Sequence, residues 1–303
     1  MKKLIALFLV ATVLSCSSED QTSQSPDTAS NSLSVLDGKL LSFKDDESFI
    51  KEYNGLTELK TGTKLQDWIS EKGHPSLLNI KKTEEELDNE TEASKDYYSD
   101  AIKAILNSES KLKIGGKVIW LNDDKLYKLE GSNETKSPEE LKLLKKLEIY
   151  GRISGKITKK DVTSREIPNA NRLKEWSTQY NNGQREKVIS IGLFNETIYL
   201  NGVVQSTKMF VKVLSLGKYC SVWKCRWNSE NNGNVTLGLW FNSNWGNGNF
   251  TTQLSDANNS VMIASGYDWS PNFAFDGLPT ATVTWVDGYT GITKTWSQQL
   301  SWY

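Results

Sequence analysis

Thr197-Ile-Tyr-Leu-Asn-Gly-Val-Val-Gln205 is the stretch that decides the fold class of this chain. Two short runs typical of β-strands flank Asn201-Gly202. That dipeptide readily adopts the positive φ angles of a two-residue hairpin turn. The stretch therefore predicts two antiparallel strands joined at this turn.

The same kind of pattern recurs through residues 185–303. Residues 280–285 alternate Thr with Ala, Val and Trp, and Asp287-Gly288 turns this strand into a second one over residues 292–296. Eight of the 11 tryptophans follow residue 184. Many short strands separated by Asn, Gly and Asp turns, without helix patterns between them, indicate an antiparallel β-sandwich over residues 185–303.

The preceding part of the chain mixes helix and strand patterns. We predict an α+β domain over residues 34–150 and a connecting segment with one or two short strands over residues 151–184. The expected elements of the α+β domain are helices over residues 47–53, 64–72, 83–106 and 137–147, and a hairpin over residues 117–129. A capping box at Thr83 opens the third of these helices, and a second box at Ser137 opens the fourth.

The first residues have the pattern of an export signal. Lys2 and Lys3 precede an 11-residue apolar run over residues 4–14. A membrane-spanning helix needs about 20 residues. We therefore predict that residues 1–15 form a cleaved signal peptide. Residues 17–33 are rich in Ser, Thr, Gln and Asp and cannot bury a core, so they are expected to form a disordered tether behind Cys16.

Val13-Leu14-Ser15-Cys16 resembles the lipobox of bacterial lipoproteins. This resemblance implies that Cys16 is acylated and anchors the chain in a lipid bilayer. The acidic stretch Ser17-Ser18-Glu19-Asp20 resembles the signal that directs such lipoproteins to the cell surface. Asp27-Thr28-Ala29 resembles their O-glycosylation acceptor, with Thr28 as the modified residue. Together the resemblances imply an outer-membrane lipoprotein exposed on the cell surface.

The N-terminal half is similar to a family of uncharacterised cell-envelope lipoproteins from Bacteroidota. The similarity covers residues 36–128. It is carried by residues 43–49 (Phe-Lys-Asp-Asp-Glu-Ser-Phe), Trp68, residues 73–77 (Gly-His-Pro-Ser-Leu) and residues 114–119 (Ile-Gly-Gly-Lys-Val-Ile). The family carries no known activity, so the resemblance implies no catalytic residue.

Composition excludes several classes of function. Lys and Arg total 36 against 37 for Asp and Glu, so no electrostatic attraction to nucleic acid is expected. His74 is the single histidine among 303 residues, which excludes zinc sites built from several histidines. A Ser-His-acid triad would depend on His74, which lies in a turn-like setting. We predict no cofactor, no metal and no catalytic residue.

Cys220 and Cys225 lie in Tyr219-Cys-Ser-Val-Trp-Lys-Cys-Arg-Trp227. On one straight strand, two positions five apart point to opposite faces and cannot meet disulfide geometry. The pattern therefore favours two buried thiols. A disulfide would need a bulge or a turn between them, although an exported setting permits oxidation.

Two polar loops, over residues 242–249 and 266–272, each contain a tryptophan. An indole beside amide groups offers a flat apolar face for a sugar ring and hydrogen-bonding partners for its hydroxyls. The alternative is that each ring covers one end of the sandwich. The candidate binding residues are Trp245, Trp269, Tyr267, Asp268, Asn244 and Asn247.

These observations predict a membrane-anchored binding module at the cell envelope, with a glycan or a host macromolecule as its ligand. An alternative is a polysaccharide-active enzyme that uses acidic residues of the sandwich. Asp268, beside Trp269, is its best single candidate, but no pair of carboxylates can be assigned. A third interpretation is an envelope protein with protein partners only.

Overall fold

The described part of the computed structural model comprises residues 32–59, 62–80, 98–153, 173–220, 222, 225–229, 235–243, 246–254, 260–266 and 280–300. The signal peptide, Cys16 and Thr28 lie outside these residues, so the predictions made for them stay predictions.

The predicted hairpin around Asn201-Gly202 is confirmed and forms the centre of the fold. Strands β8 (Glu186–Leu200) and β9 (Val203–Cys220) pair antiparallel along almost their whole length. Asn201 has φ 49° and Gly202 has φ 84°, as a two-residue turn of this type requires. At 15 and 18 residues, these two strands are long enough to join both parts of the chain.

An eleven-stranded sheet is built around this pair in the order β1-β2-β3-β4-β5-β6-β8-β9-β10, with β7 also paired to β8 and β13 to β9. Only β2 and β3 pair in parallel among the described strands. The remaining strands are β1 (Ser34–Asp37), β2 (Leu40–Phe43), β3 (Lys111–Ile114), β4 (Lys117–Asn122), β5 (Lys125–Leu129), β6 (Glu148–Ile153), β7 (Leu173–Asn181), β10 (Cys225–Ser229) and β13 (Ser260–Gly266).

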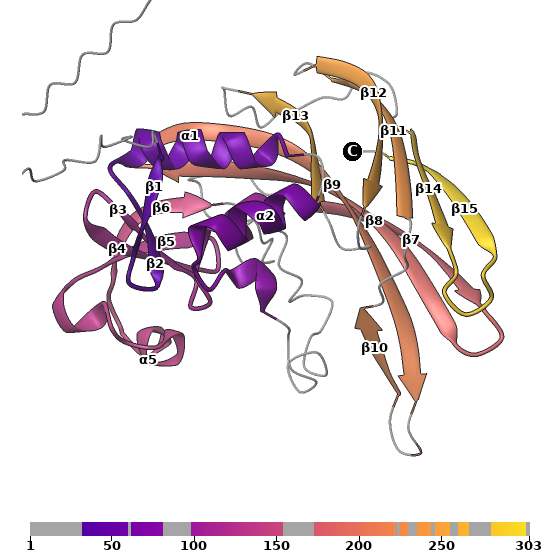
Figure 1. Ribbon diagram of the computed structural model, residues 1–303, viewed down its shortest axis with the longest axis horizontal. Coiled ribbons are helices and arrows are strands. Elements are labelled where there is room, and N and C mark those ends of the chain that lie inside the picture. Colours follow the sequence, from indigo (N-terminus) through magenta and orange to yellow (C-terminus); the bar gives the residue numbers. More distant parts are fainter. Residues whose placement is uncertain are drawn as a thin grey trace, which may run out of the picture. The chain divides into compact units, whose positions relative to one another are not determined.

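A second sheet of four strands packs on one face of β8 and β9 (Figure 1). Its order is β12 (Gly246–Leu254), β11 (Val235–Ser243), β14 (Thr280–Val286) and β15 (Thr293–Gln299). The shared core contains Ile189, Ile191 and Leu193 of β8, Met209, Val211 and Val213 of β9, and Val235, Leu237, Leu239, Ala281, Val283 and Trp285 of the second sheet. Two sheets facing one another across an apolar core agree with the predicted β-rich, sandwich-like fold.

Four α-helices lie in the described part of the chain: α1 (Asp46–Thr57), α2 (Gly62–Lys72), α4 (Asp100–Ile105) and α5 (Pro138–Lys142). Short 3-10 turns cover Leu77–Asn79 and Gly131–Asn133. The capping box at Ser137 is confirmed. A continuous helix up to Leu106 is wrong, because Ser99 is extended and caps a new helix that begins at Asp100. Residues 81–97 lie outside the described residues. None of the described helices has the length and apolarity needed to cross a membrane.

The predicted division into separate domains is not confirmed. Strand β8 pairs with β6 at one end, where Gly151 lies opposite Leu200, and with β7 at the other. Strands β6 and β8 approach so closely that a Cβ at Gly151 would lie 2.4 Å from the Tyr199 carbonyl oxygen. Residues Leu33–Tyr303 form one compact unit.

Candidate functional site

The strands that carry the two predicted binding loops end at the same end of the sandwich. Strand β11 ends at Ser243, directly opposite Gly246 at the start of β12. Only residues 255–259 link the end of β12 to the start of β13. The end of β12 and the start of β13 therefore lie together at one end of the sandwich. The start of β12 and the end of β13 at Gly266 lie at the opposite end, which is the upper end in Figure 1.

Most of the predicted binding residues lie beyond these strand ends, outside the described residues: Asn244, Trp245, Tyr267, Asp268 and Trp269. Asn247 belongs to β12, where its backbone pairs with that of Asn242. The strand topology brings the strand ends that precede the two loops to one end of the sandwich, and the binding role of the loop residues stays a prediction.

Trp240 lies close to this end and was not among the sequence-based candidates. It belongs to β11, three residues before Ser243, and its side chain is 43% exposed. Its neighbour Leu239 is buried in the sandwich core. The alternation of Val235, Leu237 and Leu239 with the residues between them is visible in the sequence and would have placed Trp240 on the outer side.

Glu196 of β8 is fully buried and binds protein donors. Its carboxylate accepts hydrogen bonds from the Tyr53 hydroxyl (2.6 Å), the Ser99 hydroxyl (2.6 Å) and the Ser99 backbone N–H (2.8 Å). Burial raises the pKa of Glu196, although these hydrogen bonds oppose the shift. The cluster ties α1 and the cap of α4 to the central sheet.

Lys208 of β9 lies opposite Glu196 in the sheet register and is also buried. Burial lowers its pKa, while the carboxylates of Glu58 and Glu196 act in the opposite direction. Its ammonium lies 5.8 Å from the centre of the Tyr53 ring. The side chains of Tyr53, Ser99 and Glu196 thus form a buried hydrogen-bonded cluster. The Lys208 ammonium lies beside this cluster and donates to the Met262 sulfur at 3.5 Å.

Asp287 is a second buried carboxylate, and its predicted role in a turn is confirmed. It accepts hydrogen bonds from the backbone N–H groups of Tyr289 (3.0 Å) and Thr290 (2.9 Å). It also accepts from the Tyr180 hydroxyl (3.1 Å) and the Asn182 amide (3.3 Å). Asp287 therefore holds the turn after β14 against the turn after β7.

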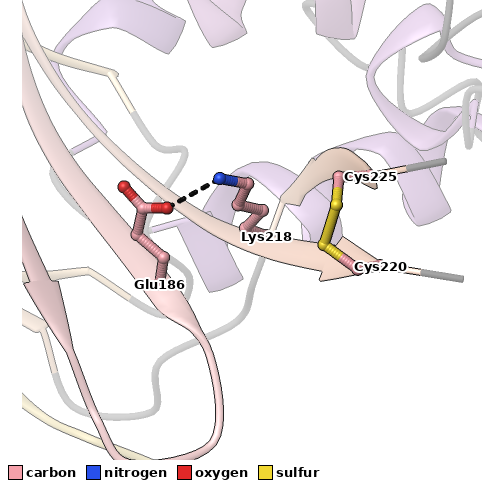
Figure 2. Close-up of a disulfide and its surroundings, with 4 residues drawn as sticks. All are labelled: Glu186, Lys218, Cys220 and Cys225. Atoms are coloured by element: carbon pink, nitrogen blue, oxygen red, sulfur yellow. Dashed lines mark hydrogen bonds and ion pairs between the residues drawn. A yellow bond between two sulfur atoms is a disulfide. The ribbon is translucent and has the colours of Figure 1, made fainter.

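The prediction of one straight strand through residues 219–227 is wrong, and with it the prediction of two free thiols. Strand β9 ends at Cys220 and β10 begins at Cys225, so a turn separates them and the two residues lie opposite one another. A disulfide joins them, with Cα atoms 3.9 Å apart (Figure 2). Beside it, Lys218 binds the Glu186 carboxylate at 2.9 Å.

His74 is buried and serves as a structural contact. Its Nε2 atom lies 2.6 Å from the carbonyl oxygen of Ala104, and burial lowers its pKa. Ser76 nearby donates its hydroxyl hydrogen to the Lys103 carbonyl at 2.9 Å. Within the described ranges, no group of three or more His, Cys, Asp or Glu could hold a metal ion.

Comparison of the chain with protein-family models, curated proteins and solved structures finds no match.

Proposed function

We propose that this chain is an exported, membrane-anchored binding module of the cell envelope, and that the upper end of its sandwich binds glycans. The observation that carries the proposal is the exposed indole of Trp240 at the end where the strands leading to the Trp245 and Trp269 loops converge. An exposed aromatic face beside amides and hydroxyls suits a sugar ring.

The disulfide supports the exported setting of this proposal. Disulfides persist in oxidising compartments outside the cytosol. The Cys220–Cys225 bond therefore agrees with an N-terminal export signal.

Metabolic labelling with palmitate tests the proposed lipid anchor at Cys16. The full chain should incorporate label, and Cys16→Ser should lose both the label and the membrane fraction.

Binding without catalysis is favoured over a polysaccharide-active enzyme because the candidate carboxylates that the structure describes are bound to protein groups. Glu186 pairs with Lys218, Glu196 is enclosed by Tyr53 and Ser99, and Asp287 holds a turn. Asp268 lies outside the described residues and remains the candidate for the enzyme alternative.

A glycan array tests the proposed site. The wild-type chain should bind, and Trp245→Ala or Trp269→Ala should weaken binding at least about tenfold, as truncated aromatic anchors commonly do. Unchanged binding in both variants would remove the loops from the site. Screening for released sugars, with Asp268→Asn as the control, separates a binder from an enzyme.

A further inference from the structure

We infer that the ligand is an uncharged glycan chain and that the outer face of the four-stranded sheet contacts it. This outer face is formed by the described residues of β12, β11, β14 and β15 whose side chains point away from the core. The inference rests on the proposed function, because it names the ligand class and extends the same site along the sheet.

The outer face carries no charge at its described positions. In β14, Ala281, Val283 and Trp285 point into the core, and Thr280, Thr282 and Thr284 alternate with them. The residues that pair with these threonines lie on the same face, and the described ones are Thr, Ser, Asn, Gln and Gly besides Trp240 and Val286. Lys294 of β15 lies on the opposite face, with its ammonium 4.6 Å from the Tyr180 ring centre.

Hydroxyl groups on the outer face are already fixed in place by one another. Thr282 and Ser297 share a hydrogen bond of 2.9 Å between β14 and β15, and Thr284 and Thr295 share one of 3.1 Å. A hydroxyl has one donor and two acceptor sites, so each pair keeps hydrogen-bonding capacity for a ligand. Preordered partners reduce the entropy lost on binding.

Trp240 provides the apolar platform of this face. Asn249 and Thr280 lie opposite it on the two neighbouring strands. Two residues along β11, Gly238 has no side chain, and a Cβ there would meet the Thr282 carbonyl oxygen at 3.9 Å and the Thr251 hydroxyl at 4.0 Å without a clash. An indole with a vacant position beside it and amide and hydroxyl groups around it can receive a sugar ring.

The chemistry of the face selects among ligand classes. Nucleic acids and acidic glycans need cationic side chains, which the described outer face lacks. A protein interface needs a desolvated apolar core. Here Trp240 and Val286 are the described large apolar side chains. A neutral polysaccharide matches an uncharged surface with one aromatic platform.

Affinity electrophoresis tests the inference with gels that contain hydroxyethylcellulose, arabinoxylan or galactomannan, and with acidic control gels of polygalacturonate or alginate. At least one uncharged polysaccharide should retard the wild-type chain, and the acidic ones should not. Trp240→Ala should raise the apparent dissociation constant about tenfold or more. Tyr289→Ala removes an aromatic side chain that is 60% exposed at the opposite end of the sheet, and it should have no effect.

Gly238→Thr guards against a folding artefact. A Cβ at Gly238 meets its nearest neighbours at ordinary contact distances of 3.9 and 4.0 Å, and β-branched residues favour strands, so the variant should fold about as stably as wild type while weakening retardation at least about threefold. Unchanged retardation in both Trp240→Ala and Gly238→Thr would overturn the inference. If Trp245→Ala then abolished binding, the proposed glycan site at the loops would still stand. Retardation by acidic polysaccharides alone would also overturn it. No retardation in any gel would overturn the proposed function as well. A dimer that Trp240→Ala dissociates would identify a second copy as the occupant and would overturn the inference.

Discussion

Tyr53 donates its hydroxyl hydrogen to Glu196 over 2.6 Å, and both side chains are fully buried. The two residues are 143 positions apart in the sequence and connect α1 to the central strand β8. Ser99 completes the contact from the start of α4. Helices α1 and α4 are therefore fixed to β8, the strand that also lines the sandwich core.

Glu196→Ala should lower the free energy of unfolding by about 3 kcal/mol, because it leaves the Tyr53 and Ser99 donors buried without an acceptor. Glu186→Ala is the matched control. Its ion pair with Lys218 is partly exposed, so the loss should stay below about 1 kcal/mol. Urea denaturation measures both. Equal effects of the two substitutions would show that the buried cluster does not hold the helices to β8.

Asp287 should make stability sensitive to acid. Burial by itself would raise its pKa, but hydrogen bonds from Thr290, Tyr180 and Asn182 outweigh burial and hold the pKa well below the usual range. The unfolded chain, with a pKa of about 3.9 for this group, then binds more protons than the folded one as the pH falls. The stabilisation is present above about pH 4 and is lost progressively below it.

The corresponding test compares the wild-type chain with Asp287→Asn by denaturation from pH 7 to pH 2.5. The variant should be less stable at pH 7 and should lose less additional stability below pH 4. Parallel curves for the two proteins over this range would contradict the role assigned to Asp287.

Gly151 should tolerate no side chain. A Cβ there would lie 2.4 Å from the Tyr199 carbonyl oxygen and 2.8 Å from Leu200 Cδ2, so Gly151→Ala should force β6 and β8 apart at a cost of about 1–3 kcal/mol. Gly55 in α1 meets no atom within 4 Å, and Gly55→Ala should instead stabilise by about 0.5–1 kcal/mol. Thermal unfolding distinguishes the opposite signs. A neutral Gly151→Ala would argue against the close pairing of β6 with β8.

The Cys220–Cys225 bond should protect both thiols from alkylation until a reductant is added, as followed by mass spectrometry. Because the bond closes a short loop, Cys220→Ser combined with Cys225→Ser should cost about 2 kcal/mol of stability. Labelling of both cysteines without reductant would show that the hairpin is open in solution.

The elements that could be predicted are those with local signals. Asn201-Gly202 defines its own turn, and Ser137 with Glu140 defines its own helix start. The turn between Cys220 and Cys225 was missed because Ser221-Val-Trp-Lys224 contains neither Gly nor Asn. A straight strand therefore looked like the simpler interpretation.

Contacts between distant segments were beyond local patterns. Nothing near Glu196 in the sequence indicates that Tyr53 and Ser99 cover it, and the pairing of β6 with β8 depends on tertiary packing. Trp240 is different, because its outward position follows from the alternation in β11.

The central claim is that the chain binds uncharged glycans and does not cleave them. The most direct measurement incubates the purified chain with uncharged polysaccharides and determines, on the same samples, the bound protein and the newly formed reducing ends. We expect saturable binding to at least one polysaccharide with no new reducing ends. Absence of binding to all of them, or release of reducing ends that Asp268→Asn abolishes, would contradict it.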